Sequence, residues 1–100
     1  MKKLLLLLPL SISFLSAADW PRWLGPDGTG VSTESDWKNN LEEQAWKAKV
    51  GVGFSTVSVA DGRLYTMGHD GRKSGGNETV YCLDAKTGKA VWTHSYPAPL

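Results

Sequence analysis

The side chains best suited to acid–base or metal chemistry are two histidines and an acid beside the first of them. His69 precedes Asp70 at the start of a polar, glycine-rich stretch, and His94 lies further along the chain in an apolar alternation. Two imidazoles without a third ligand make a poor metal site, and no residue lies in the strained turn that exposes a catalytic nucleophile. We therefore predict no catalytic and no metal-binding residue, with His69 as a solvated loop residue and His94 at the edge of a sheet.

The other polar stretches do not complete a ligand-binding motif. Residues 51–53 and 75–76 are glycine-rich, but they lack the lysine, the hydroxyl residue and the following helix of a phosphate-binding loop. Residues 70–73 lack the acids and the spacing of a calcium loop. The chain carries 11 basic and 10 acidic residues, which excludes the charge patch of a nucleic-acid-binding protein. The single cysteine, Cys82, is expected to be a small buried side chain, because it lies in an apolar alternation.

Residues 1–18 have the layout of a secretory signal peptide. Two lysines form a short basic start, residues 4–15 are largely apolar, and small residues then precede Asp19. A membrane anchor is the alternative, but a helix over residues 4–15 would span only about 18 Å of a hydrocarbon core about 30 Å thick. We predict cleavage between Ala18 and Asp19, export to the periplasm or the exterior, and no membrane span in the mature chain. Loss of the two lysines leaves 9 basic and 10 acidic groups, so binding to nucleic acid is not expected.

Residues 19–43 are predicted to form an irregular N-terminal arm. Their apolar residues follow neither the period of a strand nor that of a helix, and Pro26, Asp27 and Gly28 in succession favour a turn. The arm carries Trp20 and Trp23, and we expect both to pack against other parts of the molecule, because two exposed indoles would form a sticky patch.

Residues 44–100 are predicted to be all β. Asp61 and Gly62 form the strongest hairpin signal, with alternating apolar residues on both sides. One four-stranded sheet cannot bury both of its faces, so we expect further parts of a longer chain to cover them. A separate outer strand carrying Trp46 is expected at residues 44–50. The four antiparallel strands are expected at residues 54–59, 63–67, 79–83 and 90–94, with a polar loop at 68–77.

The turn after the third of these strands carries the most information. Asp84, Thr87, Gly88 and Trp92 follow one another at spacings of three, one and four residues. Asp84 can accept hydrogen bonds from the backbone of its own turn, and Gly88 tolerates a positive φ. The spacing resembles the tryptophan-docking repeat of quinoprotein-type eight-bladed β-propellers, in which Cys82 stands where alanine is usual.

Three further features fit this resemblance. Asp61 and Gly62 lie where the repeat has its inner hairpin, and Trp46 precedes Trp92 by 46 residues, in line with one repeat. The arm around Trp20 is similar to the mature N-terminus of secreted PQQ-binding-like β-propeller repeat proteins. Trp92 is expected to bury its ring between two blades and to donate its indole N–H to a carbonyl of the adjoining blade.

The resemblance implies the N-terminal part of an exported PQQ-like β-propeller, eight-bladed when complete, that acts as a binding or scaffold module. Its partners would be the remaining blades of the same chain, and other exported proteins or a small-molecule ligand. The alternative is the N-terminal part of a periplasmic quinoprotein dehydrogenase that oxidises alcohols or sugars with PQQ and calcium. The catalytic groups of such an enzyme are expected beyond residue 100, so no cofactor-binding residue is assigned here, and the fold alone does not establish an activity.

Overall fold

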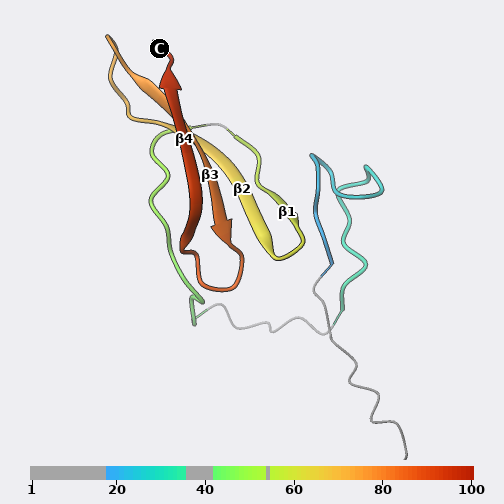
Figure 1. The fold of residues 1–100 in the computed structure, drawn as a ribbon. Coiled ribbons are helices and arrows are strands. Elements are labelled where there is room, and N and C mark those ends of the chain that lie inside the picture. Colours follow the sequence, from blue (N-terminus) through green and yellow to red (C-terminus); the bar gives the residue numbers. More distant parts are fainter. Residues whose placement is uncertain (1–17, 36–41, 54) are drawn as a thin grey trace, which may run out of the picture.

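The computed structural model describes residues 18–35, 42–53 and 55–100, so nearly all of the expected signal peptide lies outside the described residues. The described chain is all β, and its strands form one open antiparallel sheet in which each strand pairs with the next along the chain. Figure 1 shows β4 at one edge and β1 at the other. The strands are β1 (Ser58–Ala60), β2 (Arg63–His69), β3 (Asn77–Asp84) and β4 (Ala90–Pro97). The expected four-stranded antiparallel meander is therefore present.

The β1–β2 hairpin forms where Asp61 and Gly62 predict it. Ala60 pairs with Arg63, so these two residues are the whole connection. Their φ angles are 50° and 72°. A two-residue turn that matches the strand twist needs positive φ at both central positions, which aspartate tolerates and glycine adopts freely.

The longer strands extend beyond their expected ends. The β2 strand continues through Gly68 to His69, so the loop between β2 and β3 is shorter than expected. Gly68 fits inside the strand because the carbonyl group of Val50 occupies the space that a side chain would need. The β4 strand continues to Pro97, a residue that strands tolerate at a sheet edge because it has no N–H to donate.

The outer strand expected at residues 44–50 is not formed. Nearby, the backbone pairs only through an isolated bridge between Val52 and His69, with N–O distances of 2.9 and 2.6 Å. Residue types favour a strand but do not supply the neighbouring backbone that a strand must pair with. The segment is held instead by the side chain of Trp46, which contacts the turn between β3 and β4. The β1 strand also begins at Ser58 rather than at Phe54, which lies outside the described residues.

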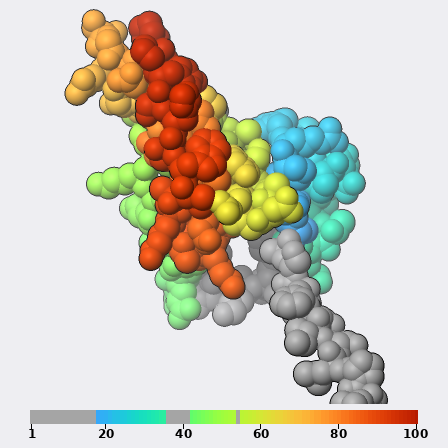
Figure 2. All heavy atoms as spheres, in the orientation of Figure 1, coloured from blue at the N-terminus to red at the C-terminus, as the bar shows by residue number. Residues whose placement is uncertain are grey.

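The described part of the arm, residues 18–35, consists of turns and bends, as expected. Trp20 forms an isolated bridge with Val59, with two N–O distances of 2.8 Å, and Figure 2 shows the arm in blue beside the β1–β2 hairpin in yellow. The ring of Trp20 lies over Gly25, where a Cβ atom would overlap it. Trp23 is 70% exposed. The expectation that both indoles pack is therefore right for Trp20 and wrong for Trp23, because only Trp20 is tied to the sheet and folded back over its own turn.

The apolar core of the described residues is small. Cys82 and Leu83 are its buried members, and successive residues of a strand point to opposite faces. Both faces of the sheet are thus covered locally at this point. A register shift also occurs here, since Cys82 pairs with Trp92 but Leu83 pairs with Ala90. Much of the remaining sheet surface is exposed to solvent. Among the described residues there is no helix long and apolar enough to cross a membrane.

Candidate functional site

The turn between β3 and β4 is organised by Asp84. Its carboxylate oxygen Oδ1 accepts hydrogen bonds from the backbone N–H groups of Lys86 and Thr87, both at 2.9 Å, and from the Thr87 hydroxyl at 3.2 Å. The N–H group of Thr87, and next that of Lys86, hold the pKa of Asp84 below its usual value, because these bonds favour the charged form. The N–H of Gly88 donates to the Asp84 carbonyl oxygen at 2.8 Å, which closes the turn.

This turn receives the indole of Trp46. The Nε1–H group of Trp46 donates to the Ala85 carbonyl oxygen at 3.0 Å. The ring lies against Gly88, which has a φ of 72°, and a Cβ atom at position 88 would overlap the indole. A glycine is needed here both for the backbone conformation and for the close approach of the ring. The fold thus brings Trp46 onto the turn formed by Asp84 and Gly88, although Trp46 lies about 40 residues earlier in the sequence.

Trp92 occupies a different environment. Its side chain on β4 is 46% exposed, and its ring centroid lies 6.3 Å from that of Tyr65, with the rings tilted by 52°. Cys82, between them in the sheet register, is 1% exposed, so the expected small buried cysteine is present. The burial expected for Trp92 between two blades is not found within the described residues, which form a single sheet with no neighbouring sheet to cover the ring.

The residues of the predicted hairpin and of the expected cleavage point lie apart from the Asp84 turn. Asp61 and Gly62 form the β1–β2 turn, and the N–H of Asp61 donates to Asp19 Oδ1 at 3.1 Å. On the other side of the expected cleavage point, the N–H of Ala18 donates to Glu34 Oε1 at 2.7 Å. The expected new N-terminus therefore lies beside the hairpin, where the arm meets the sheet.

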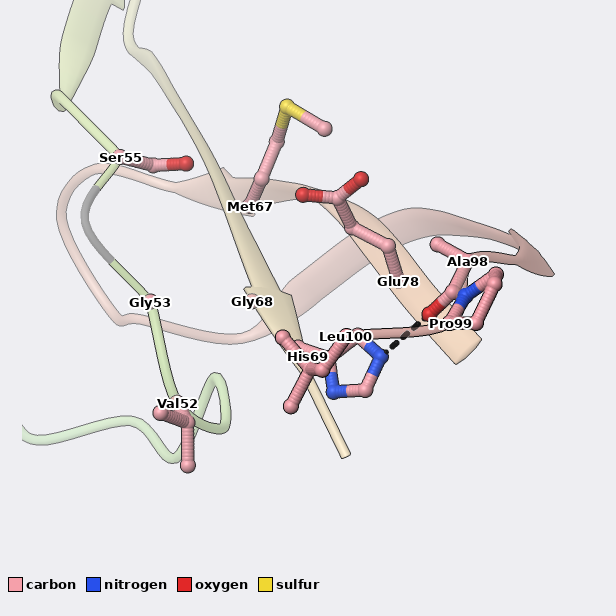
Figure 3. Close-up of a pocket in the computed structure, with 10 residues that line it drawn as sticks. All are labelled: Val52, Gly53, Ser55, Met67, Gly68, His69, Glu78, Ala98, Pro99 and Leu100. Atoms are coloured by element: carbon pink, nitrogen blue, oxygen red, sulfur yellow. Dashed lines mark hydrogen bonds between the residues drawn. The ribbon is translucent and has the colours of Figure 1, made fainter. Parts of the chain in front are cut away.

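A surface pocket of about 320 Å³ lies at the opposite end of β2 (Figure 3). Its wall includes His69, which is only 7% exposed. The expectation of a solvated loop histidine is therefore wrong. β2 continues through this residue, the chain after β4 returns beside it, and the imidazole lies against Gly76, where a Cβ atom would overlap the ring. The only sequence signal for this packing is the glycine at position 76, which is indistinguishable by type from the loop glycines around it.

Both ring nitrogens of His69 have partners. Nδ1 accepts a hydrogen bond from the Gly71 N–H at 2.9 Å. Nε2 lies 2.6 Å from the Ala98 carbonyl oxygen, which can only accept, so Nε2 must carry the proton. One neutral tautomer satisfies both contacts.

The carboxylate in the same pocket also has a partner. Glu78 lies opposite both His69 and Tyr96 in the sheet register. The Tyr96 hydroxyl donates to Glu78 Oε2 at 2.5 Å, and this hydrogen bond is the main reason why the pKa of Tyr96 is raised. Among the described residues no three His, Cys, Asp or Glu side chains are grouped so that they could hold a metal ion. The pocket therefore presents polar groups that are engaged with one another and with the backbone.

Comparisons with protein-family models, with curated proteins and with solved structures each found no match to this chain. Its interpretation consequently depends on its own residues and their geometry.

Proposed function

We propose that this chain is the N-terminal arm and first blade of an exported PQQ-like β-propeller that serves as a binding or scaffold module. The observation that carries the proposal is the docking of Trp46 on the turn that begins at Asp84. An indole from outside the four-stranded sheet donates to the Ala85 carbonyl oxygen and packs on Gly88. Such a contact suits an array of repeats whose units cannot bury their faces alone and must be joined to their neighbours.

The position of Trp92 supports the same proposal. Trp92 follows the turn on β4 at the spacing of one repeat from Trp46, and it is largely open. A second turn with the Asp-x-x-Thr-Gly pattern would accept Trp92 as the first accepts Trp46. The sheet would then gain a neighbour over the surface that carries Tyr65 and Trp92, which are both exposed in this chain.

The first experiment is to read the genomic sequence that follows codon 100. We expect further Asp-x-x-Thr-Gly-x-x-x-Trp patterns at intervals of roughly 40 to 50 residues, the length of a propeller repeat. A stop codon directly after Leu100, or a continuation without such patterns, would overturn the propeller assignment.

The second experiment separates a scaffold from a quinoprotein enzyme. The purified full-length protein is titrated with PQQ and calcium while tryptophan fluorescence and dye-linked alcohol oxidation are followed. As a scaffold it should show neither saturable PQQ binding nor turnover. Binding in the micromolar range with turnover would leave the propeller assignment intact and replace the scaffold function with that of an oxidoreductase.

A further inference from the structure

His69 connects two segments that follow different strands. Its Nε2–H group donates to the carbonyl oxygen of Ala98, just after β4, and its Nδ1 atom accepts from the N–H of Gly71, just after β2. The first contact needs a proton on Nε2, and the second needs a bare Nδ1. The two contacts therefore respond differently when the imidazole binds a second proton.

A second proton can only enter at Nδ1, because Nε2 already carries one. The cationic ring is a donor at both nitrogens, so the Gly71 N–H would then face another N–H group at 2.9 Å. Asp70 offers the alternative, because its Oδ1 atom lies 3.6 Å from Nδ1. We propose that His69 is a proton-sensitive latch: protonation transfers Nδ1 from the Gly71 amide to the Asp70 carboxylate and releases the loop after β2, while the contact with Ala98 persists.

The charged groups around the ring determine how the latch responds. Asp70 is the nearest acid, and Glu78, opposite His69 on β3, is bonded to the Tyr96 hydroxyl of β4. The basic side chains of the loop between β2 and β3 are those at positions 72 and 73. Asp70 is thus the acid placed to pair with the Nδ1–H group of a doubly protonated ring.

Asp70 is already committed to the loop backbone. Its Oδ1 atom accepts from the Arg72 N–H at 3.0 Å, and its Oδ2 atom accepts from the Asn77 N–H at 3.2 Å. These bonds, led by that of Arg72, lower the pKa of Asp70, so its carboxylate stays charged in mildly acidic solution. A protonated His69 would compete with the Arg72 N–H for the same oxygen atom. Protonation therefore weakens two loop contacts, those of Gly71 and Arg72, and not only one.

The test is nuclear magnetic resonance of the full chain between about pH 8 and pH 5, the interval in which an imidazole changes its charge. The nitrogen shifts of the His69 ring should identify the Nε2–H tautomer at the upper end. Towards the lower end, hydrogen exchange of the Gly71 amide, corrected for its intrinsic pH dependence, should accelerate about 2- to 10-fold, the range that corresponds to one lost hydrogen bond. The Nε2–H proton should remain observable throughout.

Two variants provide the controls. His94→Gln removes the exposed histidine of β4 and should leave the pH response of Gly71 as it is in the wild type. His69→Gln should abolish that response, whatever its effect on stability. An Nδ1–H tautomer at about pH 8, unchanged Gly71 exchange in the wild type, or an equal response in His69→Gln would each overturn the proposal.

Discussion

The indole of Trp46 lies so close to Gly88 that a Cβ atom at position 88 would overlap its ring system. Along the sequence, the two residues are separated by all of β1, β2 and β3. Their contact therefore reports whether the segment before the sheet is docked on the β3–β4 turn, and it can be tested without a ligand.

Gly88→Ala should destabilise the chain by two separate effects. A positive φ costs a residue with a side chain about 1–2 kcal/mol, and the overlap with Trp46 adds about 1–3 kcal/mol of overpacking. Gly62→Ala is the matched control, because Gly62 has the same φ of 72° but no other part of the chain within 4 Å of the place that a Cβ atom would take. Urea unfolding of both variants should show the larger loss for Gly88→Ala. Equal losses would mean that the Trp46 contact contributes nothing.

The two tryptophans should respond differently to the same substitution. Trp46→Phe removes the hydrogen bond to Ala85 and should cost about 0.5–1.5 kcal/mol. Trp92→Phe should cost less, because no hydrogen bond from its indole is found within the described residues. Chemical denaturation of the chain of residues 1–100 measures both, and the reverse order would contradict the docking of Trp46.

In a longer protein, Trp92 should contribute more to stability than it does in residues 1–100. If a following repeat covers Trp92, Trp92→Ala should cost several kcal/mol, on the scale of about 3–5 kcal/mol for a buried aromatic side chain. The same substitution in residues 1–100 should cost much less, since the ring is 46% exposed. Denaturation of the short and long chains side by side would detect this. An equal cost in both would speak against a repeat that covers Trp92.

Stability should fall in acid partly because of Asp84. Backbone N–H groups of Thr87 and Lys86 lower the pKa of Asp84 in the folded chain. The charged carboxylate therefore stabilises the fold at pH values above its unfolded pKa of about 3.9, and this stabilisation is lost as the pH falls through its lower folded pKa. Asp84→Asn should reduce the loss of folding stability as the pH is lowered. Asp27→Asn, in the arm, serves as the control, and the test is the midpoint of urea unfolding at several pH values. An equally steep loss of stability with falling pH in Asp84→Asn and in the wild type would contradict the role of this carboxylate.

Export should remove residues 1–18. The basic start, the apolar stretch and the small residues before Asp19 have the order that signal peptidase recognises. N-terminal sequencing of exported material should therefore begin at Asp19. A chain that retains Met1 and stays in the membrane fraction would contradict this prediction.

The sequence predicted best those elements that local chemistry determines. The Asp61–Gly62 turn and the Asp84 turn each depend on residues within a few positions of one another, and both form where they were expected. The edge position of His94 also followed from the strand order, since β4 is an outer strand of the described sheet.

The contacts between distant segments could not be predicted in the same way. The burial of His69 depends on Ala98 and on the space left by Gly76, and neither residue type is unusual for a loop. Residues 44–50 have the composition of a strand, but no neighbouring backbone in the described part of the chain pairs with them. Trp46 was assigned to the repeat by its spacing from Trp92, whereas its acceptor, the carbonyl of Ala85, became evident only from the three-dimensional arrangement.

The register shift between Cys82 and Leu83 has a consequence for the outer edge of the sheet. It leaves Val91 as an extra residue between Trp92 and Ala90 on β4, and such a bulge bends the strand and interrupts the regular row of donors and acceptors. Pro97, at the other end of β4, contributes no N–H at all. An incoming strand from another molecule would find a continuous template only over the few residues between these two interruptions, so the bulge and the proline restrict the length over which the edge of β4 can pair with a second chain.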